Sequence, residues 1–223
     1  MFFHVNDSIK LEALKGLCAI SEQKNFVVLL VNLIPDLVSI IDGSNKLHMK
    51  EALRIVGNIA YSNEASHLMQ STLMDSLKKL LGSKEEYFLK ECAWIVSNIA
   101  ADGFINELLE ADIYPRIIEL LTHKNLKIRR ESIYVISNST KNGDCEQIKQ
   151  LVLMDVIRVL TKLIDEKETA EIILTSCESI FNILDRGYYY FCEPPRVNLY
   201  AILVDKYGGN VYENIFIQST KYS

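Results

Sequence analysis

The sequence contains few residues that interrupt helices. Its 223 residues include nine Gly and four Pro, whereas 49% are apolar and 24% are charged. Apolar residues recur at helical spacing, and the alternation that marks strands is absent. This composition and this periodicity are typical of a soluble, all-α protein.

A cysteine framework and a membrane signal are also missing. The five cysteines (Cys18, Cys92, Cys145, Cys177 and Cys192) are odd in number, widely spaced and without a C-x-x-C pair. This pattern indicates a reducing compartment and no disulfide framework.

The first ten residues, MFFHVNDSIK, lack the basic start and the long apolar stretch of a signal peptide. No apolar run reaches the roughly 20 residues that a membrane span needs, so we expect no membrane association.

Catalytic and metal-binding motifs are not found. The sequence has no H-E-x-x-H, G-x-S-x-G, G-x-x-x-x-G-K-[ST] or G-x-G-x-x-G. Its four histidines are scattered near expected helix ends or loops, where we expect them to be solvated: His4, His48, His67 and His123. The net charge of −5 provides no basic field for direct nucleic-acid binding. We therefore expect a protein that is not an enzyme and that has no metal or cofactor.

A repeat of 40 residues is the main feature that the sequence does have. Three segments read EALRIVGNIA, ECAWIVSNIA and ESIYVISNST. Each begins with Glu, has a large side chain at its fourth position and has Asn at its eighth. These residues are Glu51, Arg54 and Asn58, then Glu91, Trp94 and Asn98, then Glu131, Tyr134 and Asn138. Self-similarity at such a period indicates a stacked helical array.

The repeat predicts the organisation of the chain. Each copy contains a short, a medium and a longer third helix, and neighbouring copies bury a continuous apolar spine. We expect one domain of about five repeats over residues 1–223. Its parts are a partial repeat at 1–21, repeats at about 22–62, 63–102, 103–142 and 143–187, and an incomplete terminal repeat at 188–223.

The repeated polar residues lie on the helix face opposite the expected core. Around Trp94, apolar residues fall on one face, and Glu91, Trp94, Ser97 and Asn98 on the other; Glu131, Tyr134, Ser137 and Asn138 do the same one copy later. If Trp94 were the only such residue, we would interpret it as a side chain that packs against a neighbouring repeat. In repeated copies, such residues predict a binding surface. Asn amides could pair with the backbone of an extended peptide, rings could hold Lys or Arg stems, and carboxylates could hold their charged ends.

These segments resemble a known family. ALRIVGNI, KECAWIVSNI and RRESIYVISNST are similar to armadillo repeats of importin-α, the receptor for nuclear localisation signals, in its C-terminal half. The resemblance implies a right-handed superhelical armadillo solenoid that binds Lys/Arg-rich cargo signals in a concave groove for nuclear import. By this resemblance, the backbone of the signal is bound by Asn58, Asn98 and Asn138, and the slots for its cations are lined by Trp94 and Tyr134. The charged ends of those cations are received by Glu91 and Glu131. Ser97 lies at the rim with Ser137 in the equivalent position, and Arg54 replaces an aromatic residue.

The resemblance also has departures, which limit the expected partners. Glu178 stands four residues before Asn182, so no aromatic slot is expected in that repeat. The family's Arg-rich segment that binds importin-β is absent from this sequence, which speaks against that partner. The resemblance implies a location in the cytoplasm and nucleus. The alternative function is an armadillo-repeat scaffold that joins other proteins and has lost cargo transport.

The ends of the chain suggest two further features. Met1–Phe3 is apolar and is expected to be a cut edge or a surface for self-association. The run Tyr188–Phe191 either closes the end of the array or forms a patch for a partner, and we favour the first because terminal repeats need a cap.

Overall fold

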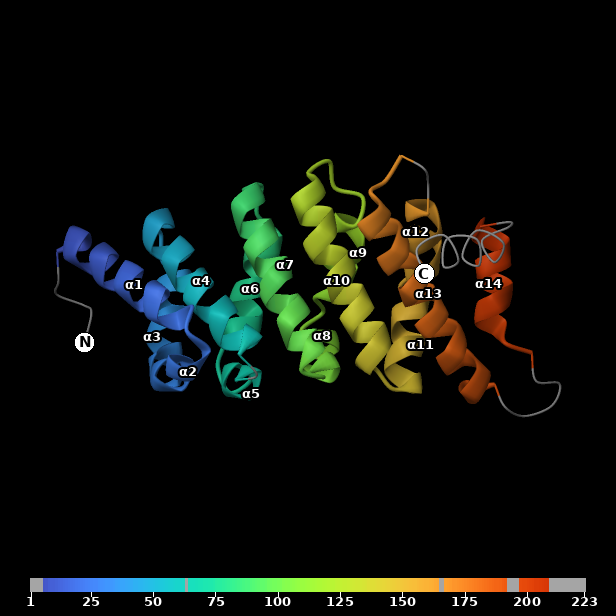
Figure 1. The fold of residues 1–223 in the computed structure, drawn as a ribbon, viewed down its shortest axis with the longest axis horizontal. Helices are drawn as coiled ribbons and strands as arrows, with labels where there is room; N and C mark the ends of the chain where they lie inside the picture. The colour runs from blue at the N-terminus through green and yellow to red at the C-terminus, as the bar shows by residue number, and fades with distance from the viewer. Residues whose placement is uncertain (1–5, 63, 165–166, 192–196, 209–223) are drawn as a thin grey trace. The chain divides into compact units, whose positions relative to one another are not determined.

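The computed structural model describes residues 6–62, 64–164, 167–191 and 197–208. These residues form helices joined by turns, and no strand occurs among them (Figure 1). The all-α expectation is therefore confirmed. The expectations for Met1–Phe3 and Cys192 lie outside the described residues, as does the last part of the incomplete terminal repeat. The chain packs as two compact units, residues 1–112 and 113–223.

The first unit contains eight α-helices and one 3₁₀-helix among its described residues. They are α1 (Asp7–Ser21), α2 (Lys24–Val27), η1 (Val28–Leu33), α3 (Ile34–Ile41), α4 (Lys46–Tyr61), α5 (Ala65–Leu68), α6 (Leu73–Leu81), α7 (Glu86–Ala101) and α8 (Ile105–Glu110). The long helix α4 packs against both α1 and α7 (Figure 1). Its residues Leu53, Ile55, Val56 and Ile59 are fully buried. These side chains recur at helical spacing, so burial of this face holds the three long helices together.

The second unit contains six described helices. They are α9 (Tyr114–Leu120), α10 (Leu126–Asn142), α11 (Cys145–Leu153), α12 (Val156–Leu163), α13 (Ala170–Tyr190) and α14 (Leu199–Gly208). The longest, α13, packs against α10, α11, α12 and α14. Tyr114 is fully buried, and its hydroxyl lies 2.8 Å from Ser139 Oγ, so this large polar side chain has a hydrogen-bond partner in the core.

Three of the long third helices are preceded by residues whose side chains cap the first turn. Asn45 precedes α4, Asn125 precedes α10 and Thr169 precedes α13; each side-chain oxygen accepts a hydrogen bond from a backbone N–H of the first turn. Such caps satisfy donors that have no partner within the helix. The helix α7 differs, because Glu85 at its start makes no capping hydrogen bond.

Among the described residues, one apolar segment is long enough to cross a membrane by length and composition. It is Lys24–Ile41, with a mean hydropathy of 1.8. In the structure, α2, η1 and α3 divide this segment, and seven of its apolar residues are buried: Val27, Leu30, Ile34, Leu37, Val38, Ile40 and Ile41. Three other apolar residues of this segment, Phe26, Val28 and Leu29, are 51–67% exposed.

Candidate functional site

In the first unit, α4 and α7 bring a guanidinium, an indole ring and a carboxylate together. The Arg54 guanidinium carbon lies 5.2 Å from the centroid of the Trp94 ring, within the range of a cation–π interaction. Arg54 Nη1 is also 3.6 Å from Glu91 Oε2, and Lys90 Nζ is 2.5 Å from Glu91 Oε1. These four residues are called the Trp94 cluster below. With two cations and one carboxylate, the cluster carries one net positive charge.

Two residues of this region are less exposed than the sequence analysis expects. Glu91 is 1% exposed and Ser97 is 4% exposed, although both are predicted to lie on the polar surface. The Ser97 hydroxyl donates to the Trp94 carbonyl at 2.9 Å, so it bonds within its own helix. Packing of neighbouring helices covers both residues, which helical periodicity alone does not predict. The prediction that they are surface residues is wrong.

The Trp94 ring lies directly against a glycine of α4. A Cβ atom built on Gly57 would come within 2.0 Å of Trp94 Cζ3, closer than any real contact. Gly57 therefore makes the space that the indole ring occupies. Gly57 is not among the predicted site residues, although the equivalent positions in the next two copies hold Ser97 and Ser137, which are.

The amide of Asn58 faces a small open cavity in the first unit. Asn58 Nδ2 donates to Ser21 Oγ at 2.8 Å. The cavity has a volume of about 340 Å³, and Lys24, Arg54, Asn58, Tyr61 and Trp94 are among the residues that line it. Lys24 Nζ lies 4.2 Å from the centroid of the Tyr61 ring. The cavity wall thus provides amide, aromatic and cationic groups.

Asn98 occupies the equivalent position on α7 and is half-buried. Its Nδ2 atom is buried and has no hydrogen-bond partner among the described residues. A buried donor without an acceptor costs about 1–3 kcal/mol. Such groups are rare in folded proteins and call for an explanation, which a bound ligand can supply.

In the second unit, the aromatic residue of the repeat has a different partner. The Tyr134 hydroxyl on α10 donates to Glu171 Oε1 on α13 at 2.6 Å. Arg130 Nε is 2.7 Å from Glu171 Oε2. These three residues are called the Tyr134 cluster. The hydrogen bond to Glu171, together with burial, raises the pKa of Tyr134 to about 12.

Glu171 is a residue that the sequence analysis misses. The resemblance assigns the carboxylate of this slot to Glu131, which is half-buried on α10 together with Ser137 and Asn138. A signal for Glu171 nevertheless exists. Tyr134 and Glu171 are 37 residues apart, which is also the interval between Arg54 and Glu91, the pair that meets in the first unit. A side chain of one third helix therefore meets a carboxylate 37 residues further along.

The structure distributes the candidate residues over the two units. Arg54, Asn58, Glu91, Trp94, Ser97 and Asn98 lie in the first unit, on α4 and α7. Glu131, Tyr134, Ser137 and Asn138 lie on α10 in the second.

Among the described residues, no group of three or more His, Cys, Asp or Glu side chains is placed to hold a metal ion. His48 also differs from expectation: it is 5% exposed, and its Nε2 lies 3.1 Å from the Asp7 carbonyl oxygen.

The run Tyr188–Phe191 does not close the second unit as expected. Tyr188 is 71% exposed and Tyr189 is 61% exposed. Only the end of the run packs inward: the Phe191 ring lies 5.2 Å from that of Tyr200 on α14. The reason is helical geometry, because four consecutive residues of a helix point in four directions and cannot all face one neighbour.

Comparison with known proteins identifies the fold. No protein-family model and no curated protein matches the sequence. Solved structures do match. A designed armadillo repeat protein has a TM-score of 0.81 at 22% identity, over 92% of this chain and 84% of that chain. A second one, in complex with the peptide (KR)4, has a TM-score of 0.79 at 23% identity, over 97% and 93%. Computationally designed armadillo repeat proteins for modular peptide recognition match at 0.75 and 24% identity, over 82% and 80%.

These matches define the class of protein. The chain has the all-α armadillo-repeat fold, as the sequence analysis predicts. Its neighbours include one designed protein solved in complex with a peptide and others designed for modular peptide recognition.

Proposed function

We propose that this protein is an importin-α-like adaptor that binds Lys/Arg-rich signals of cargo proteins for import into the nucleus. It acts as a binding protein rather than as an enzyme, and it works in the cytoplasm and the nucleus. The observation that carries the proposal is the Trp94 cluster. A guanidinium already lies over the Trp94 ring with a carboxylate at its head, which is the arrangement that a cargo Arg would require.

The contacts also suggest how cargo would enter. Arg54 is 45% exposed, so its interactions with the ring and with Glu91 are weakened by solvent. An exposed cation–π contact contributes about 0.5–1 kcal/mol. A cargo cation could therefore displace Arg54 at small cost and take over its contacts. The buried Asn98 amide nitrogen, which lacks an acceptor, would gain one from a peptide carbonyl after a small rotation.

The neighbouring structures support the ligand class. One of the designed armadillo repeat proteins was solved with an alternating Lys-Arg peptide. That peptide belongs to that protein, and at 23% identity the likeness concerns the fold. It supports the proposal because a protein with the same repeat fold binds a peptide of Lys and Arg.

Calorimetric titration with the octapeptide (KR)4 tests the proposal. The wild type should bind with an affinity that falls as salt rises. Trp94→Ala should weaken binding by about 1–3 kcal/mol, as truncation of an anchoring residue does. Arg54→Ala should strengthen binding several-fold, because the substitution removes the guanidinium from the Trp94 ring and leaves Glu91 with one cation fewer. Leu47→Ala, at a residue 57% exposed on the first turn of α4, is the matched control and should change nothing.

Two results would contradict the adaptor function. The first is no binding of (KR)4 at low salt. The second is equal binding of (KR)4 and an uncharged octapeptide of alternating Gln and Ser, because the proposed slots recognise cations.

A scaffold without cargo transport is the second candidate. It is favoured by one observation: Glu91 already forms ion pairs with Lys90 and Arg54, so its charge is countered without a ligand, while its buried Oε2 accepts no hydrogen bond from the residues that the structure describes. A protein partner without basic segments that binds wild type and Trp94→Ala equally would support the scaffold over the adaptor.

A further inference from the structure

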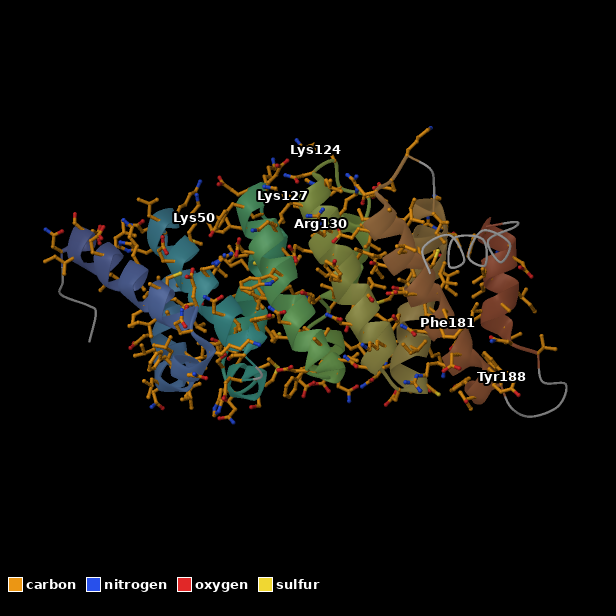
Figure 2. The ribbon with its side chains drawn as sticks, in the orientation of Figure 1. Lys50, Lys124, Lys127, Arg130, Phe181 and Tyr188 are labelled. Atoms are coloured by element: carbon orange, nitrogen blue, oxygen red, sulfur yellow. The ribbon has the colours of Figure 1, made fainter. Side chains whose placement is uncertain are left out.

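The part of α13 from Glu178 to Tyr188 carries four exposed side chains on one line of the helix. They are Glu178, Phe181, Asp185 and Tyr188, so carboxylates and rings alternate. Their spacings of three, four and three residues place them on one helical face. Phe181 is 64% exposed and Tyr188 is 71% exposed. Figure 2 labels both rings on this part of α13. These four residues are called the α13 stripe.

The neighbouring residues that the structure describes do not neutralise or cover the α13 stripe. Within the part of the chain that the structure describes, no ion pair or hydrogen bond engages the carboxylate of Glu178 or Asp185. Arg186 turns away, because its Nη2 donates to the Lys141 carbonyl of α10 at 3.5 Å. Lys149 is held by Glu146 and by the Tyr190 hydroxyl. The two carboxylates therefore keep their charge available to a partner.

The chemistry of the α13 stripe defines what it can bind. Rings that are exposed together mark a contact surface. Each ring has a carboxylate one helical turn away, about 5–6 Å between Cβ atoms. Such a pair suits the stem of Lys or Arg over the ring and its charged end on the carboxylate. An acidic partner or a nucleic-acid backbone would be repelled.

Charge also argues against a second copy as the occupant. A two-fold dimer through this face would place the same patch against itself. Glu178 and Asp185 of each copy would then lie near like charges, which is unfavourable. A cationic segment has no such conflict.

We propose that the α13 stripe binds a short basic segment of a partner protein, with one cation at each ring. The rings are seven residues apart, about 10 Å along a helix. An extended chain covers that distance in about three residues. The best ligand therefore has Lys or Arg at positions i and i+3. The inference shares its ligand class with the proposed function, and Glu178 occupies the repeat position of Trp94 and Tyr134. Neither the Trp94 cluster nor the Tyr134 cluster contributes a residue to the α13 stripe, so the two sites can be tested separately.

Cross-linking of (KR)4 to the full chain tests this site directly. A zero-length carbodiimide joins a peptide Lys amine to a nearby carboxylate, and mass spectrometry locates the bond. We expect cross-links at Glu178 and Asp185 in the wild type and in Trp94→Ala. Phe181→Ser combined with Tyr188→Ser should reduce their yield at least fivefold, because the stems lose the rings. Urea unfolding checks that this double variant remains folded.

Calorimetry gives the second measurement. Glu178→Gln combined with Asp185→Asn should remove the α13 site and lower the number of bound peptides. Glu110→Gln, at an exposed carboxylate of α8, should leave it unchanged.

The outcomes separate this inference from the proposed function. If (KR)4 binds and Trp94→Ala weakens it, but no cross-link forms on α13, the inference is overturned and the adaptor function stands. If cross-links form on α13 and Trp94→Ala has no effect, the inference stands without the adaptor function. If (KR)4 does not bind, both fall. If light scattering shows a dimer that the Phe181/Tyr188 double variant abolishes, the α13 stripe is a self-association face and the inference is overturned.

Discussion

The Trp94 cluster and the Tyr134 cluster occupy equivalent places in successive repeats, yet their rings meet opposite charges. The Trp94 ring receives a cation, Arg54, from the preceding third helix. The Tyr134 ring presents its hydroxyl to an anion, Glu171, on the following one. The difference follows from the ring itself, because an indole offers a π-face for a cation, whereas a phenol can also donate a hydrogen bond to a carboxylate.

The comparison shows how one repeat can serve two purposes. In the first unit, one buried carboxylate pairs with two cations beside an open cavity. In the second, the ring and a cation share one half-buried carboxylate, which ties α10 to α13. We therefore expect Trp94 to be available for exchange with a ligand, whereas Tyr134 contributes more to holding its unit together.

The largest expected effect comes from removing the buried charge of Glu91. Glu91→Gln leaves Arg54 and Lys90 without their shared carboxylate. Loss of a partner in a buried pair costs about 3–5 kcal/mol. Arg54 and Lys90 are partly exposed, so we expect a loss of about 1–3 kcal/mol in the free energy of unfolding. Urea unfolding measures it.

The matched change in the second unit is Glu171→Gln. Its side chain is 35% exposed, and it remains able to accept a hydrogen bond from Tyr134, so we expect a loss of about 1 kcal/mol or less. An equal or larger loss than for Glu91→Gln would show that the two carboxylates do not differ as proposed.

Gly57→Ala should have the next largest effect. An added Cβ would overlap the Trp94 ring. Overpacking costs about 1–3 kcal/mol, of which the better helix propensity of Ala recovers up to about 1 kcal/mol. We expect a net loss of about 1–2 kcal/mol and a red shift of fluorescence as the ring moves towards water. The readout is specific because Trp94 is the only tryptophan.

Gly16→Ala is the control for Gly57→Ala. Nothing lies within 4 Å of a Cβ at Gly16 in α1, so this change should stabilise the protein slightly through helix propensity. If both substitutions stabilise the protein by the same amount, the Trp94 ring does not depend on Gly57.

A further test of the Tyr134 cluster is Tyr134→Phe, which removes the hydrogen bond to Glu171. At neutral pH we expect a loss of about 0.5–1.5 kcal/mol. The pKa of Tyr134 is raised from its ordinary value of 10 to about 12, so the folded state holds this proton more tightly than the unfolded chain. The stabilisation is therefore fully present below pH 10 and is lost as the pH rises through 12.

Unfolding in urea at several alkaline pH values measures this decline. The difference between wild type and Tyr134→Phe should shrink above pH 10. Tyr189→Phe, at a residue 61% exposed, should leave the free energy of unfolding unchanged at neutral pH. A difference that persists undiminished to pH 12 would contradict the hydrogen bond as its source.

Much of the fold could be predicted from the sequence, and less of the candidate site. The third helices around Asn58, Asn98 and Asn138 are present where the repeat predicts them. The burial of Glu91 and the pairing of Tyr134 with Glu171 were not predicted. Both depend on how far one helix is displaced along its neighbour, which the pattern within a single helix does not contain.

Gly57 is another residue whose role depends on a contact between helices. Its place in ALRIVGNI is plain in the sequence, but the reason for a glycine is the ring of Trp94, 37 residues further on. The two aromatic residues of the α13 stripe can likewise be read from the sequence. Their exposure to solvent, however, depends on how α14 and the rest of the unit pack against α13.

The sequence by itself determined that this chain is a helical repeat protein and which residues recur on each third helix, because helical periodicity is a local property of the chain. The tertiary structure alone decided that Glu91 is buried between two cations, that Tyr134 donates to Glu171, and that Phe181 and Tyr188 are exposed. These outcomes depend on which helices meet and at what offset, and packing of side chains from distant parts of the sequence sets that offset.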